Sequence, residues 1–213
     1  MKINRFKCNS YGITKIEVIV IIGVLILLCS VLAAWLAQPK YRMSEISCAG
    51  KLDRIGIAFE GYASEHREAY PMTVSVADGG THEYTSSGYD TYRHFQIFSN
   101  TIALSEFLVC PQDNRRAAAK WVDMTNTNVS YFVGLDADNN KPNSILAGDR
   151  NVTSNSGTII TPRSGLKWVE GMGLHGASGH VLFADGHVKM LDSTALSNAI
   201  QQGENPTNRI AVP

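Results

Sequence analysis

Residues 16–37 form an apolar run that is long enough to cross a membrane as a helix. At 1.5 Å per residue, about 22 helical residues span roughly 33 Å, against roughly 30 Å for a hydrocarbon core. Glu17 is the only charged residue in the run. A carboxylate costs roughly 2.5–3.5 kcal/mol at mid-bilayer and less near the interface, so we expect Glu17 to be retained for a partner. The alternative is an ordinary signal anchor whose Glu17 lies among lipid headgroups.

The residues before the run predict its orientation. Lys2, Arg5 and Lys7 are basic, and no acid precedes Glu17. Positive charge of this kind stays on the cytoplasmic side. The apolar region of a secretory signal peptide would end after roughly 7–15 residues, well before this run ends. We therefore expect a single-pass inner-membrane protein, with a cytoplasmic N-terminus and a periplasmic or extracellular C-terminal domain.

The sequence Gly12-Ile13-Thr14-Lys15-Ile16-Glu17 resembles the processing site of type IV prepilins and type II secretion pseudopilins, usually Gly followed by Phe-Thr-Leu-Ile-Glu. This resemblance implies that a prepilin peptidase cuts after Gly12 and methylates the amine of Ile13. Glu17 would then be the fifth residue of the mature chain, pairing with the amine of a neighbouring subunit in a fibre. Ile13 and Lys15 depart from the usual Phe and Leu.

Length and charge bound the rest of the chain. The 213 residues leave room for one membrane helix and one domain of roughly 150 residues. The 19 basic and 19 acidic residues give no net charge, so we expect no nucleic acid as partner. The expected parts are a leader (1–12), a membrane and assembly helix (13–37), its amphipathic continuation (38–70) and a β-rich globular domain (71–213).

The continuation of the helix is predicted by an apolar stripe at alternating spacings of four and three. Its members are Cys48, Leu52, Ile55, Phe59 and Tyr62. Pro39 either kinks one long helix or separates two helices, and the stripe is the same in both cases. Tyr70 precedes Pro71, a position that disfavours helix, so we expect the helix to end there.

Four cysteines are present, at positions 8, 29, 48 and 110. Cys8 lies in the expected leader and Cys29 in the membrane run, which leaves Cys48 and Cys110 as the pair in the globular part. Outside the cytoplasm a disulfide between them is allowed. Two buried thiols are the alternative.

The first half of the globular part, residues 72–130, is rich in Gly, Ser, Thr, Asn and Asp, and predicts loops with short strands, one of them at 107–111. After it, Asp136, Asp138 and Asn140 offer oxygen ligands for calcium. They lack the glycine and the final glutamate of an EF-hand loop, so a solvated turn is favoured over a calcium site.

Residues 179–191 predict a β-hairpin, because Asp185-Gly186 separates two β-prone runs. A two-residue type I′ turn sets Phe183 opposite Val188 and requires positive φ at Asp185. The same register places Val181, Phe183, Val188 and Met190 on one face, which we expect to pack on the long helix.

The hairpin and the segment before it contain residue types that bind metals: His175, His180, Asp185 and His187. In the expected register His180 lies four residues from the partner of His187, or about 13 Å along the strand, so the two cannot share an ion. A site from His175, Asp185 and His187 would need the segment before Gly179 to fold back. The chain contains no Gly-x-Ser-x-Gly elbow, phosphate-binding glycine loop or Cys-x-x-Cys pair.

His175, nine further residues and Asp185-Gly186 also resemble the C-terminal signature of a family of prepilin-like proteins. With the N-terminal site, this resemblance covers residues 12 to about 191. It assigns no catalytic role to His175 or Asp185, and the turn alone explains Asp185.

These features predict an α+β, pilin-like protein: a long N-terminal helix, half in the membrane, packed on a mainly antiparallel sheet. We expect a structural subunit of a pilus-like or secretion-associated fibre, with no enzymatic activity and no cofactor. Its expected partners are the membrane, a prepilin peptidase and copies of itself or related pseudopilins. The alternative is a membrane-tethered binding or enzymatic domain that never polymerises.

Overall fold

The computed structural model describes residues 14–37, 39–103, 105–153, 157–161, 166–171, 174–203 and 207–213. It divides into two compact units, Met1–Met43 (unit 1) and Ser44–Pro213 (unit 2). The first two helices are α1 (Lys15–Ala37) and α2 (Pro39–Glu65), and α2 belongs to unit 2 from Ser44 onward. Pro39 is the first residue of α2, where the missing N–H of proline costs no helical hydrogen bond.

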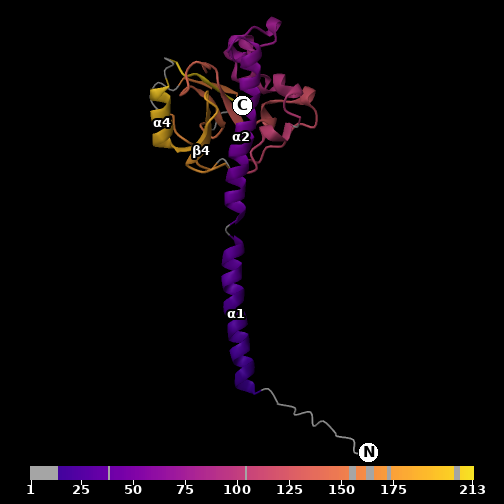
Figure 1. Ribbon diagram of the computed structural model, residues 1–213, viewed down its shortest axis with the longest axis vertical. Helices are drawn as coiled ribbons and strands as arrows, with labels where there is room; N and C mark the ends of the chain where they lie inside the picture. The colour runs from indigo at the N-terminus through magenta and orange to yellow at the C-terminus, as the bar shows by residue number, and fades with distance from the viewer. Residues whose placement is uncertain are drawn as a thin grey trace, which may run out of the picture. The chain divides into compact units, whose positions relative to one another are not determined.

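Helix α1 is labelled in Figure 1. Its sequence is apolar on every side. All of its side chains from Lys15 to Ala33 are exposed. A helix that is apolar all round is typical of a membrane span, and this stretch is long and apolar enough to cross one.

Helix α2 buries the predicted apolar stripe in unit 2. Cys48, Leu52, Ile55 and Phe59 are fully buried, and Tyr62 packs against the same core. The helix ends at Glu65, earlier than the expected end at Tyr70. The reason is that Arg67 and Glu68 take left-handed φ values of 57° and 62°, and the N–H of Glu68 donates to the carbonyl of Ala63 (2.8 Å).

The described strands of unit 2 form one antiparallel sheet, and the α+β prediction is confirmed. The strand order is β3-β6-β1-β2-β4-β5. The strands are β1 (Tyr131–Gly134), β2 (Ile145–Asp149), β3 (Thr158–Ile160), β4 (Ser178–Phe183), β5 (Val188–Asp192) and β6 (Ile210–Val212).

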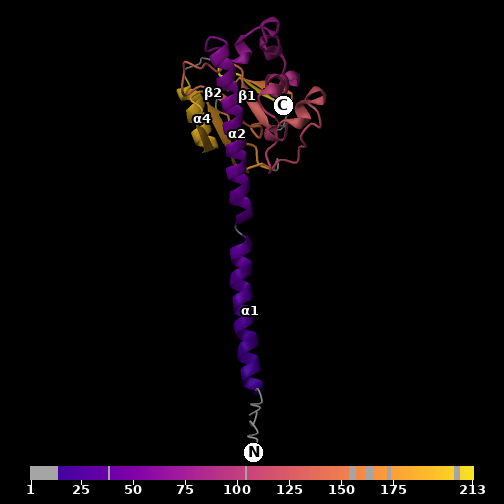
Figure 2. The ribbon, with the colours of Figure 1, turned by 45° about the vertical axis from the view of Figure 1, so that its right-hand side comes forward.

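Helices cover the two faces of this sheet. On one face, a β-carbon added at Gly56 of α2 would lie 3.0 Å from Leu182 Cδ1, so glycine there lets the helix approach β4 closely. On the other face, Leu196 and Ile200 of α4 (Ser193–Gln202) pack with Phe132 and Val181. Figure 2 shows α2 passing in front of β1 and β2.

Short helical turns occupy the chain between α2 and β1. They are α3 (Arg93–Gln96) and the 3-10 turns Pro71–Thr73, Val76–Asp78, His82–Ser86, Gly88–Asp90, Ile97–Asn100, Ser105–Leu108, Trp121–Asp123 and Asn126–Asn128. The strand predicted at 107–111 is therefore wrong. Lys51 Nζ donates to the carbonyls of Glu106 and Val109 (2.7 Å each). These main-chain carbonyls therefore bond to a side chain and not to the N–H groups of a neighbouring strand.

The hairpin of β4 and β5 is present, but its register differs by one residue from the prediction. Leu182 pairs with Val188, and Val181 with Lys189. The loop has three residues, because the N–H of Phe183 donates to the carbonyl of His187 and the N–H of Gly186 to that of Phe183 (3.0 Å each). Gly186 has φ of 83°, whereas Asp185 has no positive φ. The turn is thus a three-residue loop closed by a left-handed glycine and not a type I′ turn.

This shift moves side chains to opposite faces, because side chains alternate along a strand. Leu182 and Val188 pack on the side of α2, whereas Val181 and Phe183 pack on the side of α4. The predicted shared face of Val181, Phe183, Val188 and Met190 is therefore wrong. Met190 is 44% exposed.

Gly186→Val is expected to lower the free energy of unfolding by about 1–2 kcal/mol, because a β-branched residue tolerates left-handed φ poorly. An added β-carbon would meet nothing within 4 Å, so the loss would be conformational and not steric. Urea denaturation of the detergent-solubilised chain would measure it. Gly186→Asn is the control, since asparagine accepts this conformation; equal losses for the two variants would contradict the explanation.

Candidate functional site

A row of buried polar side chains crosses the centre of the sheet. Tyr131 of β1 lies directly opposite Asp149, the last residue of β2. Gly148 lies opposite Val181 of β4, so Asp149 is next to His180 across the following strand pair. Tyr131, Asp149 and His180 are all buried. The antiparallel register alone therefore brings these three residues to one place.

His175 reaches Asp149 from the segment before β4. The hydroxyl of Ser178 donates to the carbonyl of His175 (2.9 Å). Asn151 Nδ2 donates to the carbonyls of Gly176 (3.2 Å) and Ser178 (3.1 Å), which fastens this segment to the chain that leaves β2.

The carboxylate of Asp149 contacts both histidines through the same oxygen. Asp149 Oδ2 lies 3.5 Å from His175 Nε2 and 3.2 Å from His180 Nδ1, and it accepts the backbone N–H of His180 at 2.6 Å. The two rings meet edge to face, with centroids 4.5 Å apart. We call Asp149, His175 and His180 the Asp-His-His cluster.

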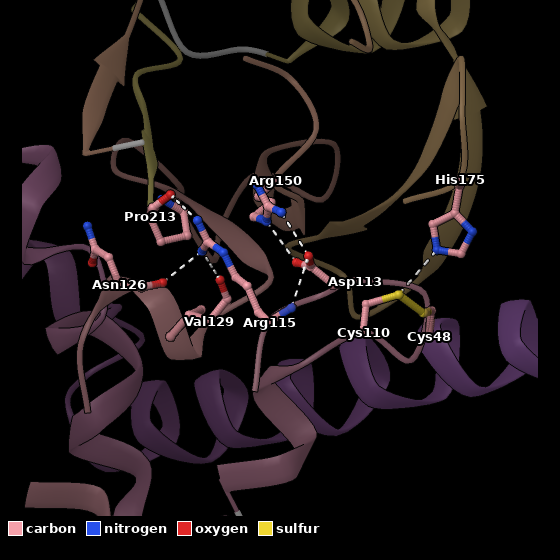
Figure 3. A network of polar contacts seen from close by, with 9 residues as sticks. All are labelled: Cys48, Cys110, Asp113, Arg115, Asn126, Val129, Arg150, His175 and Pro213. Atoms are coloured by element: carbon pink, nitrogen blue, oxygen red, sulfur yellow. Dashed lines mark hydrogen bonds and ion pairs between the residues drawn. A yellow bond between two sulfur atoms is a disulfide. The ribbon is translucent and has the colours of Figure 1, made fainter. Parts of the chain in front are cut away.

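A disulfide adjoins this cluster. Of the two alternatives for Cys48 and Cys110, the structure has the bridge, which joins α2 to the segment after the Ser105–Leu108 turn. Cys110 Sγ lies 3.5 Å from His175 Nε2. Figure 3 marks this contact with a dashed line beside the disulfide.

Arg115 and Arg150 lie on the side of the Cys48–Cys110 disulfide that faces away from His175 (Figure 3). Arg150 binds Asp113 with two hydrogen bonds of 2.7 Å, from Nε and Nη2. Burial opposes ionisation of Asp113, but the bonds from Arg150 and Ser130 and the charges of Arg150 and Arg115 lower its pKa below the ordinary value. Burial lowers the pKa of Arg115 to about 10.

Arg115 serves as a donor to main-chain carbonyls. It donates to the carbonyl oxygens of Asn126 (2.7 Å), Val129 and Pro213 (3.0 Å), which come from two separate parts of unit 2 (Figure 3). The guanidinium thus replaces hydrogen bonds that these carbonyls would otherwise make with water.

The charge of Asp149 is compensated differently from that of Asp113, which binds an arginine. Its side chain has no exposed surface, and within the described ranges its ion pairs are with His175 and His180. Arg150, the next residue, is directed to Asp113. Asp149 Oδ1 has no hydrogen-bond partner among the residues described. Burial and the charge of Asp149 raise the pKa of Tyr131 well above its ordinary value.

The residues in and before the hairpin that the sequence suggested as ligands do not all come together. His175 and His180 join Asp149, whereas His187 pairs with Asp185 at the loop and stacks on Phe183 (4.4 Å). His180 and His187 lie on opposite faces of the sheet. The prediction that these two cannot share an ion therefore holds. The one-residue shift in register means that they also lie on opposite faces, whereas the predicted register placed them on the same face.

Asp149 is the residue that sequence analysis missed. Its signal in the sequence is an acid that closes an otherwise uncharged run, Ile145-Leu146-Ala147-Gly148-Asp149, all of it buried in β2. A carboxylate at the end of a wholly buried strand needs a cation or donor from elsewhere in the fold.

The suggested calcium ligands have protein partners. Asp136 accepts from Arg209 (Nη2 to Oδ1, 2.7 Å) and Thr207 (2.6 Å). Asp138 accepts the N–H of Asn140 (3.0 Å), and its other oxygen lies 3.9 Å from Lys141 Nζ. These contacts are those of a polar turn.

Glu17 lies at the start of α1. The backbone N–H and the hydroxyl of Thr14 donate to Glu17 Oε2 (2.8 and 2.9 Å), and the N–H of Glu17 donates back to Thr14 Oγ1 (3.4 Å). This reciprocal pair is a capping box, which explains how the helix begins with a charged residue. The processing residues Gly12 and Ile13 lie outside the described residues.

No family model matches the chain, and comparison with curated proteins and with solved structures finds no match either.

Proposed function

We propose that this protein is a structural, pilin-like subunit that is processed by a prepilin peptidase and assembles into a pilus-like or secretion-associated fibre. The observation that carries the proposal is α1, with a single acid in its first turn and exposed apolar side chains around its whole circumference. In a membrane this surface contacts lipid. In an assembled fibre the same surface would be covered by the helices of other copies.

Glu17 supports an assembly role, because a carboxylate in a membrane anchor costs free energy, whereas in a fibre it can pair with a cation of a neighbouring subunit. Within one chain it has hydrogen-bond donors from Thr14 only, among the described residues, and no cation. A carboxylate in the apolar interior of a helix bundle needs a positive partner. Cleavage after Gly12 would create such a partner, the amine of Ile13 in the neighbouring subunit.

A pilin-like subunit of this kind has a defined membrane topology. The precursor would span the inner membrane once, with its N-terminus in the cytoplasm and unit 2 in the periplasm or outside the cell. The disulfide supports this topology, because such bridges persist in oxidising compartments. The partners would be the peptidase, the membrane and further copies of this chain or related pseudopilins.

Glu17→Gln is expected to insert normally but to enter sheared fibres at least roughly tenfold less than the unsubstituted chain. A loss of about 1.4 kcal/mol at the intersubunit contact corresponds to that factor. Removing one partner of a buried charge pair costs more free energy than this. Quantitative immunoblotting of membrane and fibre fractions would measure the ratio.

The control is Glu65→Gln, which removes an exposed carboxylate at the end of α2 and should leave both fractions unchanged. Equal incorporation of Glu17→Gln and the unsubstituted chain would refute the fibre role. That result would favour a membrane-tethered domain that does not polymerise.

A further inference from the structure

We propose that the Asp-His-His cluster binds one divalent transition-metal ion of the zinc type, with Asp149, His175 and His180 as ligands. The donors would be Asp149 Oδ2, His175 Nε2 and His180 Nδ1. One oxygen and two imidazole nitrogens suit zinc and its neighbours in the first transition row, whereas calcium and magnesium prefer oxygen ligands only.

The spacing of the donor atoms fits such an ion. Zinc bonds to nitrogen and carboxylate oxygen measure about 2.0–2.2 Å, so adjacent ligand atoms of a tetrahedral site lie roughly 3.3–3.6 Å apart. In the structure the distances from Asp149 Oδ2 to His175 Nε2 and His180 Nδ1 are 3.5 and 3.2 Å. One ligand atom from each of the three residues lies within 4.8 Å of the other two.

The charge of the cluster gives an independent argument. Asp113 and Asp136, two other acids of unit 2 whose side chains are largely buried, each bind an arginine through two nitrogens. Asp149 is more deeply enclosed than Asp136, yet its ion pairs among the described residues are with imidazoles, which are neutral as metal ligands. A divalent ion between the three residues would supply the missing positive charge.

Two polar atoms in the row support the same conclusion. Asp149 Oδ1 and the hydroxyl of Tyr131 are buried and lack hydrogen-bond partners within the part of the chain that the structure describes. An ion with three protein ligands keeps a fourth position for water. Such a water could donate to a free carboxylate oxygen or a phenol, so the ion and its water would satisfy groups that the protein leaves unpaired.

The ligands are held in position by main-chain contacts. The N–H of His180 donates to Asp149 Oδ2, the oxygen that would bind the ion, and orients the carboxylate. The Asn151 contacts described above hold the segment that carries His175. A bound ion would therefore join β2, β4 and this segment at a point beside the disulfide.

Zinc binding to the full chain in detergent tests the proposal. We would use a Cys8→Ser/Cys29→Ser background, so that the thiols of unit 1 and the leader bind no metal, and verify the Cys48–Cys110 bridge by non-reducing peptide mapping. After treatment with EDTA, titration calorimetry and elemental analysis should find one zinc per chain. Asp149→Asn and His180→Gln should each weaken binding by more than roughly 100-fold, beyond the loss caused by outer-shell changes.

His187→Gln is the matched control, because it removes another histidine that pairs with an aspartate in the same hairpin. It should leave the zinc affinity unchanged. Circular dichroism in EDTA would show that each variant is folded. If Asp149→Asn does not fold, the comparison of the unsubstituted chain with His180→Gln still tests the zinc site.

Three results would overturn the proposal. The first is a folded, oxidised chain that binds no zinc. The second is equal zinc affinity in the unsubstituted chain and in folded Asp149→Asn or His180→Gln. The third is zinc binding that occurs only after reduction, which would assign the metal to the thiols of Cys48 and Cys110 with His175.

Discussion

Replacing both Cys48 and Cys110 with alanine is expected to lower the free energy of unfolding of unit 2 by roughly 4 kcal/mol. The bridge joins residues separated by 62 positions, and in the chain-entropy model closing a loop of this length constrains the unfolded chain by about that amount. Both cysteines are fully buried, so the bridge also contributes packing between α2 and the segment that precedes Asp113. Urea denaturation of the detergent-solubilised, unreduced chain would measure the loss.

Cys29→Ser is the control for this experiment. Cys29 is a free, exposed cysteine of α1, so its replacement should leave the urea midpoint unchanged. If reducing agent leaves the midpoint of the unsubstituted protein unchanged, the bridge does not have the predicted effect.

Arg150→Met should destabilise unit 2 by roughly 3–5 kcal/mol. Asp113 has no exposed side-chain surface and Arg150 has 8%, so the variant would leave a buried carboxylate without its bidentate partner. Arg150→Lys keeps the charge but cannot donate from both positions, and we expect an intermediate loss. Denaturation at neutral pH would rank the three proteins.

The pH dependence of this pair has a definite sign. The folded-state pKa of Asp113 is lowered from 3.8, so its contribution is present above about pH 4 and is lost as the pH falls through the lowered pKa. The stability difference between the unsubstituted protein and Arg150→Met should therefore shrink in acid. A difference that stays constant down to the acid transition would show that Arg150 acts by packing and not through Asp113.

Local patterns in the sequence predict α1 and the buried stripe of α2, but α4 was not predicted. The apolar run that becomes α1 needs no tertiary contact to be recognised, since its length and composition suffice. The stripe of α2 follows from the period of the helix, so this period alone assigns Leu52, Ile55 and Phe59 to the core, where all three are found. The end of α2 is less predictable, because left-handed residues at Arg67 and Glu68 stop the helix before Pro71.

The hairpin shows where local reasoning stops. Asp185-Gly186 correctly marks a turn, but the number of loop residues depends on contacts made outside it. Ala184 N–H donates to the carbonyl of Ser144 (2.9 Å), and Asp185 N–H donates to the carbonyl of Pro142 (3.4 Å). These contacts accompany a three-residue loop, and one extra residue reverses the face of every side chain in the paired strand.

Local sequence is enough to define the membrane-length helix, the acid in its first turn and the apolar stripe of α2. The positions of the four cysteines are enough to choose Cys48 and Cys110 as the pair available for a bridge. The meeting of Asp149 with His175 and His180 arises only in the folded chain. It depends on strand order and on a register shift between β2 and β4, both set by packing of residues far apart in sequence. A buried charge is satisfied by whatever the fold brings to it, and a linear pattern does not encode which residue that is.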